Sequence, residues 1–375
     1  VGAAHDDRRE TLPQVQRGAS RLLLDTDFIE YLCALFIATS SLASTGVGGE
    51  AMLAPLRFAL VVAAASAAGG TRPGPAAHYV IRTSDLHATL EFAARVLGLV
   101  VLRHEENPEA CPITCNGDYA VPWSKTMVGT RAEDEAYALE ITYNYGVDGY
   151  ARGSGLHLFE MYVDDAAAAA ARATALGYSA HGTSVVGPDG YAFKLRDRPA
   201  GRREPFKSVH FEVADPKATA AWYAKTLGMA AAPHGTGERV YFAADEAESV
   251  VFDFHEGDAV VPTQHDGRNA FSLPAARVRA IYDQLARDEP DRVVHELQEI
   301  NEETGLGVLL IAIVTDVNGL ELCLVSSEAF EPAIAGAHDG VGPDWAQRAQ
   351  LAIDYADKVA EAKANKPAGF GWAEL

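Results

Sequence analysis

The chain has 375 residues, which is long for a single domain and predicts two. It carries 31 Lys and Arg against 52 Asp and Glu, a net charge of −21, and no basic run interrupts this acidic excess. Such a chain would repel a phosphate backbone, so we exclude binding to nucleic acid. Hydrophobic residues make up 48% of the sequence, which is enough for a packed core and excludes global disorder.

Residues 1–74 are expected to form an extension outside the folded part. From Met52 the chain reads MLAPLRFALVVAAASAAGG, in which Arg57 precedes the apolar stretch Phe58–Ala68 and the small residues Ala65-Ser66-Ala67 match the pattern of a cleavage site. This layout is typical of a secretory signal peptide, with an Ala-rich helix or an organelle presequence as the alternative. The apolar stretch is too short for a stable membrane span. We expect the secretory pathway or an organelle if the leader is real, and otherwise the cytoplasm or the mitochondrion.

A repeat organises the middle of the chain. Asp85, Asp164 and Asp215 are each followed twelve residues later by Leu-Gly, and each stretch predicts a helix capped by Asp and ended by Gly. Each helix follows a short strand and precedes further β-like stretches, and a weaker fourth copy begins at Asn269. The sequence therefore predicts four strand–helix–three-strand modules, over residues 75–152, 153–200, 204–266 and 267–330.

Two modules per domain give an α+β protein of two domains, with a linker in the charged stretch Arg196–Glu204. The first domain is expected over 75–200 and the second over 204–330. A tail over 331–375 contains a predicted helix, Asp344–Ala364, which could dock on the domains or offer a surface to a protein partner.

The four cysteines, Cys33, Cys111, Cys115 and Cys323, are too few for a disulfide scaffold and lack the spacing of a structural zinc module. Cys111 and Cys115 could form a bridge in an oxidising compartment. Two unbridged thiols are the preferred interpretation.

Two histidines and a glutamate are candidate metal ligands. His78 lies seven residues before Asp85 and His157 lies seven before Asp164, so the repeat places both at equivalent positions of successive modules. Glu140 lies on the last predicted strand of the first module. Imidazole and carboxylate groups suit Zn²⁺, Ni²⁺, Fe²⁺ or Mn²⁺. The alternative is that each histidine is structural.

Several strings resemble the vicinal oxygen chelate superfamily, which includes glyoxalase I. They are CNG at 115–117, WSKTMVG at 123–129, EITYNYG at 140–146 and ELCLV at 321–325. The resemblance implies a tandem fold of four βαβββ modules that form two domains with cupped mixed β-sheets. It also implies a metal-dependent lyase, with Zn or Ni preferred over Fe or Mn, that isomerises the hemithioacetal of glutathione and a 2-oxoaldehyde such as methylglyoxal.

The resemblance also implies roles for single residues. In glyoxalase I each module offers one metal ligand from its first strand and one from its last, and His78, His157 and Glu140 stand at three of these positions. The fourth position bears the glutamate that transfers the proton, and here it is Lys194. Because an ammonium group cannot ligate a metal, no catalytic base is assigned.

Arg82 and Asn144 lie four residues after His78 and Glu140. In glyoxalase I these positions hold the γ-glutamyl group, and a guanidinium with an amide can bind a carboxylate through directional hydrogen bonds. The alternatives are an internal ion pair for Arg82 and a turn for Asn144.

The second half of the repeat matches this pattern less well. Ser208 stands at the position of His78, and Cys323 stands at the last ligand position. The alternative to the lyase is therefore a binding or scaffold protein that kept the fold without a bound metal. Dioxygenation at Fe²⁺ also suits two histidines and a glutamate. The resemblance leaves a second organisation open, because tandem members of the superfamily can pair modules across domains. His78 and Glu140 would then face module four, and His157 would face module three with His210 and Asp253.

Overall fold

The computed structural model describes residues 72–242, 249–301, 308–335 and 340–365. The leader predicted from Met52 lies outside these residues. The described residues belong to one compact unit. None of the helices described is both long and apolar enough to cross a membrane.

Each module supplies a strand, a helix and further strands, as expected. The first module contains β1 (Ala76–Thr83), α3 (Leu86–Phe92), η1 (Ala93–Leu97), β2 (Val100–Asn107), β3 (Trp123–Gly129) and β4 (Ala138–Asn144). The second contains β5 (Leu156–Val163), α4 (Ala166–Ala175), β6 (Ser179–His181), β7 (Ser184–Val186), η2 (Pro188–Gly190) and β8 (Ala192–Asp197).

The other two modules follow the same order. The third contains β9 (Phe206–Val213), α5 (Pro216–Leu227), β10 (Ala230–His234), β11 (Gly237–Tyr241) and β12 (Val251–Glu256). The fourth contains η4 (Gln264–Asp266), β13 (Arg268–Leu273), α6 (Ala275–Asp288), η5 (Pro290–Arg292), β14 (Gln298–Asn301), β15 (Val308–Thr315) and β16 (Glu321–Ser326). Helices α7 (Ser327–Ile334), α8 (Trp345–Asp354) and α9 (Ala356–Ala364) end the described chain.

Aspartate caps begin three of the module helices, and two of them are the predicted ones. The Asp85 and Asp215 carboxylates each accept a hydrogen bond of 2.9 Å from the backbone N–H of the third residue of the helix that follows. Pro216 occupies the first position of α5, where its missing N–H has no intrahelical partner to lose. These two helices begin at the predicted caps.

The cap of α4 is Asp165 rather than the predicted Asp164, because the Asp165 carboxylate is the one that reaches the first turn, at 2.8 Å. Counting back seven residues from Asp165 gives Leu158. The expected equivalence of His157 with His78 is therefore wrong by one residue.

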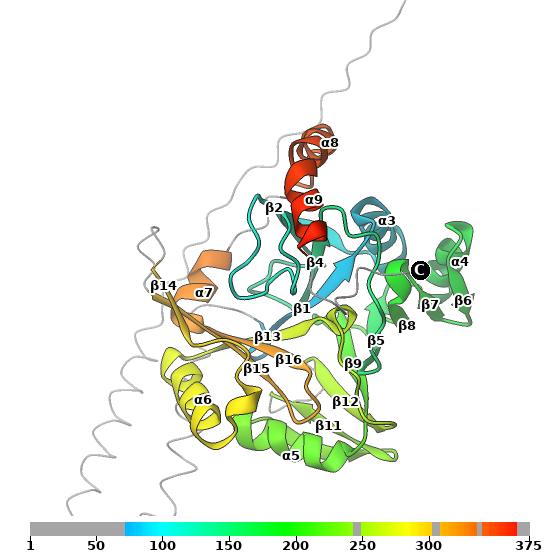
Figure 1. The fold of residues 1–375 in the computed structure, drawn as a ribbon. Coiled ribbons are helices and arrows are strands. Elements are labelled where there is room, and N and C mark those ends of the chain that lie inside the picture. Colours follow the sequence, from blue (N-terminus) through cyan, green and yellow to red (C-terminus); the bar gives the residue numbers. More distant parts are fainter. Residues whose placement is uncertain (1–71, 243–248, 302–307, 336–339, 366–375) are drawn as a thin grey trace, which may run out of the picture. The chain divides into compact units, whose positions relative to one another are not determined.

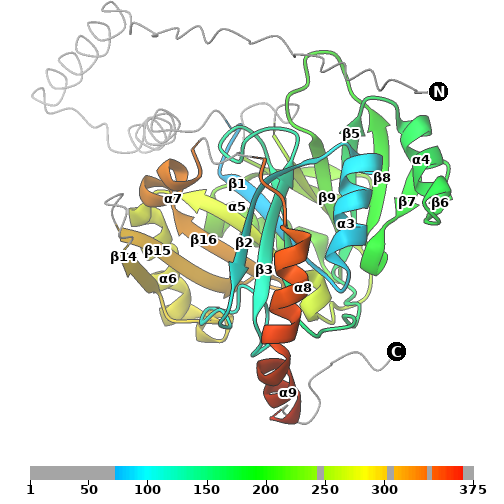
Figure 2. The ribbon, with the colours of Figure 1, turned by 90° about the horizontal axis from the view of Figure 1, so that it is seen from above.

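The strands form two eight-stranded mixed sheets (Figures 1 and 2). The order in sheet A is β14-β15-β16-β13-β1-β4-β3-β2, and the order in sheet B is β10-β11-β12-β9-β5-β8-β7-β6. Antiparallel pairing of β1 with β13 joins module one to module four, and pairing of β5 with β9 joins module two to module three.

This pairing corrects the expectation that successive modules share a domain over 75–200 and over 204–330, and it matches the alternative across domains. Only residues 198–205 separate β8 from β9, and this short connection keeps β9 in the sheet of β8, with β5 between the two strands. The first strand of each module would otherwise leave an edge of unpaired backbone groups.

The two sheets pack against each other through aromatic side chains. The Tyr79 ring on β1 lies 5.3 Å from that of Phe159 on β5 and 6.3 Å from that of Phe211 on β9, centroid to centroid. Successive residues on a strand face opposite sides, so His78 and Arg82 lie on the other face of sheet A. The core thus directs these polar residues away from sheet B.

The predicted tail helix is two helices, α8 and α9, and α8 begins at its predicted cap, Asp344. Arg348 of α8 is buried, donates a hydrogen bond of 2.9 Å to Ser124 Oγ on β3 and pairs with Glu106 on β2. The tail therefore docks on the first module.

Candidate functional site

His78 and Glu140 meet on the polar face of sheet A. β1 and β4 are parallel neighbours in which Val80 lies opposite Glu140, so the side chains of His78 and Glu140 share one face. His78 Nε2 lies 3.4 Å from Glu140 Oε2, and both residues are buried. An imidazole and a carboxylate thus form the polar centre of this face.

Burial keeps the His78 ring neutral. It lowers the pKa of His78 to about 3, an effect that Glu133 opposes and that Arg103, Lys125 and Arg72 reinforce. A neutral ring can both donate and accept a hydrogen bond.

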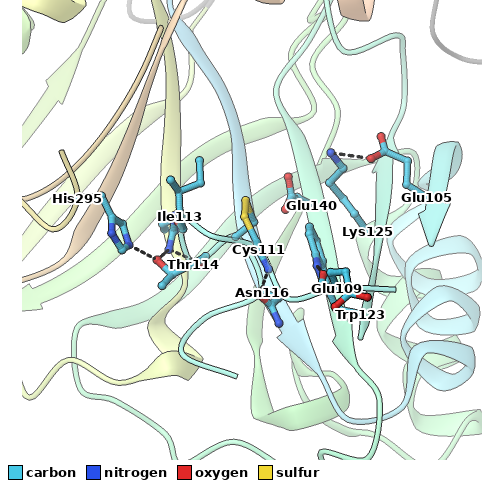
Figure 3. The surroundings of a disulfide bond; sticks show 12 residues. Glu105, Glu109, Cys111, Ile113, Thr114, Asn116, Trp123, Lys125, Glu140 and His295 are labelled. Carbon is cyan, nitrogen blue, oxygen red and sulfur yellow. Dashed lines mark hydrogen bonds and ion pairs between the residues drawn. A yellow bond between two sulfur atoms is a disulfide. The ribbon is translucent and has the colours of Figure 1, made fainter. Parts of the chain in front are cut away.

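Lys125 of β3 adds a positive charge near this centre. Its Nζ lies 3.0 Å from Glu105 Oε2, as Figure 3 shows. Burial lowers the pKa of Lys125, while the charge of Glu140 raises it.

The fourth module contributes Arg268 and Cys323 to the same face. β13 pairs with β1 so that Ala270 lies opposite His78. Glu140 lies opposite Val80, two residues after His78, and Cys323 lies opposite Ala270, two residues after Arg268, so the matching register gives Arg268 the position of His78. Cys323, which lies opposite Ala270 on β16, is likewise the counterpart of Glu140. The sequence had pointed to Cys323 for this position.

A four-ligand centre for Zn²⁺, Ni²⁺, Fe²⁺ or Mn²⁺ does not fit this face. Arg268 cannot ligate a metal, and its charge would repel one. Cys323 offers a thiol where a carboxylate is expected, and burial raises the pKa of that thiol to about 11. Across the described residues, no group of three His, Cys, Asp or Glu side chains is arranged to hold a metal ion.

The structure does not bring His157 to His78 and Glu140, because His157 lies in sheet B. A β-bulge between Leu156 and Leu158 displaces it from the regular pairing, and 48% of its side chain is exposed. Its Nδ1 lies 3.3 Å from a carboxylate oxygen of Glu212. The predicted three-ligand set is therefore not assembled as one site.

Lys194 also belongs to sheet B. It lies opposite Glu160 across β5 and β8, as Glu140 lies opposite Val80 across β1 and β4. The register thus agrees with the assignment of Lys194 to the last-strand position of module two.

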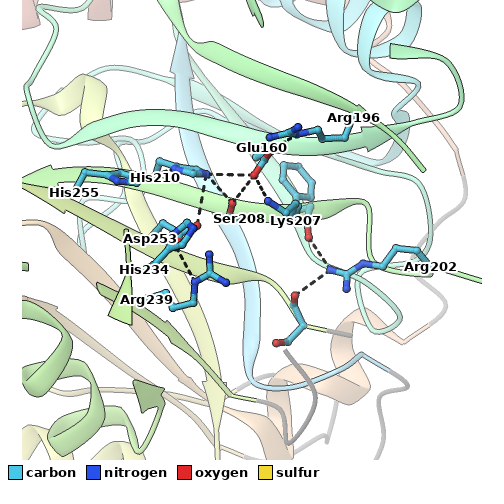
Figure 4. Close-up of polar contacts among 12 residues, drawn as sticks. Glu160, Arg196, Arg202, Lys207, Ser208, His210, His234, Arg239, Asp253 and His255 are labelled. Carbon is cyan, nitrogen blue, oxygen red and sulfur yellow. Dashed lines mark hydrogen bonds and ion pairs between the residues drawn. The ribbon is translucent and has the colours of Figure 1, made fainter. Parts of the chain in front are cut away.

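The polar face of sheet B carries a hydrogen-bonded cluster (Figure 4). Ser208 Oγ lies 2.7 Å from His210 Nε2 and 3.3 Å from Glu160 Oε2. His210 Nδ1 lies 2.7 Å from His255 Nε2. Burial acts to raise the pKa of Glu160, but hydrogen bonds with His210 and two neighbouring basic side chains hold that pKa well below its usual range.

Asp253 forms the other end of this cluster. Its carboxylate lies 2.7 Å from His234 Nδ1, 3.2 Å from Arg239 Nε and 3.7 Å from His210 Nε2. Each buried carboxylate already has several basic partners, so the polar groups of this network find their hydrogen bonds and ion pairs within it.

Arg82 and Asn144 lie on the same face as His78 and Glu140, four residues further along β1 and β4, and both are buried. Asn144 exchanges hydrogen bonds of 2.9 and 3.0 Å with Asn116 and donates one of 3.0 Å to Tyr150 Oη. Arg82 donates to the backbone oxygen of Gln264. Within the described part of the chain its guanidinium pairs with no carboxylate and its Nε has no hydrogen-bond partner, so the alternative of an internal ion pair is wrong there.

A loop closed by a disulfide lies against this end of the face. Cys111 and Cys115 are bridged, with a Cα–Cα distance of 5.4 Å, which corrects the preference for unbridged thiols. Arg268 donates a hydrogen bond of 2.6 Å to the backbone oxygen of Thr114. Thr114 Oγ lies 3.0 Å from His295 Nε2 of module four (Figure 3).

Two residues of this face, Lys125 and Arg268, were not predicted. Lys125 sits within the WSKTMVG string, and strand alternation could have placed it on the face of Glu140. No sequence pattern could have placed Arg268 on this face, because its position depends on the pairing of modules one and four.

Comparisons with known proteins agree with this architecture. The family model described as Glyoxalase/Bleomycin resistance protein/Dioxygenase superfamily matches residues 76–199. The chain is 30% identical over 267 residues to Glyoxalase domain-containing protein 4 of Rattus norvegicus, covering 68% of this chain and 86% of the relative. It is 27% identical over 279 residues to Lactoylglutathione lyase GLX1 of Arabidopsis thaliana, covering 68% and 92%. The crystal structure of glyoxalase I from Zea mays shares the fold, with a TM-score of 0.56 at 23% identity over 71% of this chain and 96% of that one.

Proposed function

This chain belongs to the Glyoxalase/Bleomycin resistance protein/Dioxygenase superfamily, and from that premise we propose that the polar face of sheet A binds a small anionic thiol adduct. The adduct is of the class that glutathione forms with a 2-oxoaldehyde such as methylglyoxal. One relative is named a lactoylglutathione lyase, which supports this choice of ligand.

The observation that carries the proposal is the guanidinium of Arg82. It is buried, and it forms no ion pair with a carboxylate among the residues described. A buried charge is costly unless it is paired. The carboxylate of a thiol peptide would supply the missing partner, with Asn144 holding Tyr150 and Asn116 around the guanidinium.

At the other end of the ligand, His78 and Glu140 would meet the carbon that carries the sulfur. The neutral imidazole can donate a hydrogen bond to an adduct oxygen, and the Glu140 carboxylate can accept one from its hydroxyl. Binding without isomerisation is the function that this residue set supports best, because two of the four expected ligand positions hold Arg268 and Cys323.

The contact of 3.4 Å between His78 and Glu140 favours a second candidate, isomerisation of the same adduct. Glu140 would take the proton from the carbon that bears the sulfur and return it to the neighbouring carbon. The C–H electron pair would form the C=C bond of an enediol intermediate. As the neighbouring carbon takes up the proton, the hydroxyl on the sulfur-bearing carbon would become the thioester carbonyl and its proton would pass to the former ketone oxygen, which gives a 2-hydroxy thioester.

Calorimetry with S-methylglutathione, a stable thioether that cannot isomerise, tests the binding. We expect wild-type protein to bind it and Arg82→Gln to bind roughly tenfold more weakly, since a charge-assisted contact is lost. Arg95→Gln is the matched control, because the Arg95 side chain is 58% exposed, and it should bind like wild type. Absence of binding to the wild-type protein would overturn the proposal.

An assay of thioester formation from the hemithioacetal separates the two candidates. It is run without added metal and with Zn²⁺, Ni²⁺, Fe²⁺ or Mn²⁺. Turnover that Glu140→Gln abolishes, while S-methylglutathione still binds, would establish the isomerase. Binding with no turnover under any of these conditions would establish the binding protein.

A further inference from the structure

Two buried arginines from different modules share one end of the polar face of sheet A. Arg268 lies opposite Val80, and Arg82 is two residues along β1 on the same face. Arg82 is 2% exposed and Arg268 is 3% exposed. Burial lowers the pKa of Arg82, and the nearby charge of Arg268 lowers it further. The two guanidinium groups therefore repel each other in a region that water does not screen.

The protein offsets only part of this positive charge. Glu321 lies 2.7 Å from Arg268, and it is the carboxylate that the described residues bring to this pair. The other acceptors are backbone oxygens, of Thr114 for Arg268 and of Gln264 for Arg82. Two guanidinium charges against one carboxylate leave one positive charge without a counter-charge.

Three buried donors at this end also lack partners. Within the described residues, neither Arg82 Nε, Arg268 Nε nor Thr142 Oγ makes a hydrogen bond. Thr142 lies opposite Arg82 on β4, so its hydroxyl is on the same face. Buried donors are nearly always satisfied, and three on adjacent strands beside an unneutralised charge match the needs of an oxyanion.

We propose that Arg82 and Arg268 together bind one oxyanion of the ligand, a carboxylate or an anion of similar chemistry, with Thr142 as a third donor. The two arginines come from modules one and four, so the anion bridges the two modules. Arg268 is the counterpart of His78, and a fixed cation thus stands where a metal ligand is expected. This inference rests on the proposed function for the ligand, and it assigns that ligand's anionic group to a second arginine.

Thermal unfolding in sodium sulfate, against sodium chloride at equal ionic strength, tests the anion site without any thiol. We expect sulfate to raise the Tm of wild-type protein and Arg268→Gln to need roughly tenfold more sulfate for the same shift. The matched control is Arg277→Gln, since Arg277 is a desolvated arginine of α6 that donates to the backbone oxygen of Thr226. It should respond like wild type.

Glu321→Gln is expected to change sulfate affinity in the opposite direction to Arg268→Gln, and this test does not require the Arg268→Gln variant to fold. It removes the carboxylate that competes with the ligand for Arg268, so we expect sulfate to bind several-fold more tightly. A purely structural pair of arginines predicts no such gain. Unchanged or weaker sulfate binding in Glu321→Gln would overturn the inference.

Calorimetry with S-methylglutathione on the same variants distinguishes this inference from the proposed function. Equal S-methylglutathione affinity in wild type and Arg268→Gln, with no sulfate effect in either, overturns the inference and leaves the proposed function standing. Sulfate binding that Arg268→Gln weakens, in a protein that does not bind S-methylglutathione, supports the inference and overturns the proposed function.

Discussion

Single side chains decide which chemistry the polar face of sheet A can support. His78 and Glu140 lie 3.4 Å apart and could be two ligands of a metal. Their counterparts in module four are Arg268, a fixed cation, and Cys323, a thiol whose pKa burial raises. With Arg268 and Cys323 at these two positions, the face suits an anion better than a divalent cation.

Glu204 is a buried carboxyl whose ionisation should be visible in the stability of the whole protein. It accepts hydrogen bonds of 3.0 Å from the backbone N–H groups of Tyr137 and Phe206. Burial nevertheless raises the pKa of Glu204 from 4.5 to about 7, against these hydrogen bonds. Between these values the folded state holds a proton that the unfolded state has lost, so stability falls as the pH rises from 4.5 towards 7.

Glu204→Gln should remove this part of the pH dependence. Between pH 4.5 and pH 8 we expect the free energy of unfolding of wild-type protein to fall, relative to the variant, by on the order of 3 kcal/mol. Urea unfolding at several pH values measures the difference. Parallel pH profiles for the two proteins would contradict the assignment, and Glu91→Gln, at a half-exposed side chain, should leave the profile unchanged.

At the scale of elements, α8 is held to the first module by a buried arginine. The guanidinium of Arg348 pairs with Glu106, donates to Ser124 Oγ and lies 4.9 and 5.1 Å from the ring centroids of Tyr143 and Tyr145. Glu106 would lose a buried charge partner if Arg348 were removed. Arg348 supplies the buried polar contacts of this docking, beside the ring contact of Tyr355 with Tyr145 and the ion pair of Lys358 with Glu109.

Arg348→Met should release α8 from strands β2 and β3. We expect a loss of about 3 kcal/mol in the free energy of unfolding, because a buried ion pair is broken from one side. Hydrogen exchange should show loss of protection in α8 and α9 while β1 and β4 keep theirs. Arg172→Met, in which an exposed side chain donates to a backbone oxygen, is the control, and equal protection of α8 in both variants would refute this account.

At the scale of the whole molecule, the pairing of modules decides which segments depend on each other. Sheet A joins the first and last modules, and sheet B joins the middle two. A cut in the segment that connects β8 to β9 therefore leaves each half of the chain with half of each sheet.

The halves 72–200 and 201–365 should not fold as separate monomers, because each would expose the edges of β1 and β5 or of β9 and β13. We expect each half alone to be unfolded or self-associated, and co-expressed halves to form a one-to-one complex. Size-exclusion chromatography and two-dimensional NMR measure this. A well-dispersed spectrum from a monomer of 72–200 would show that successive modules can form a domain after all.

The sequence by itself determined the local units of this protein. Four modules, the caps at Asp85 and Asp215 and the strands with His78 and Glu140 follow from strand alternation, capping chemistry and a repeat. These patterns involve residues only a few positions apart, so they can be recognised without knowledge of the fold. The error at Asp164 shows their limit, since a cap displaced by one residue moved His157 out of register.

Only the tertiary structure decided which modules meet, and with them the composition of the site. The spacing of Arg268 from His78 along the chain carries no sign that their strands are neighbours, and the bridge between Cys111 and Cys115 needed their geometry. Which strands pair depends on contacts between residues far apart in the sequence, namely the packing of the shared core and the backbone hydrogen bonds that satisfy the strand edges. For that reason the lone charge of Arg82, and Arg268 beside it, became visible only in the folded molecule.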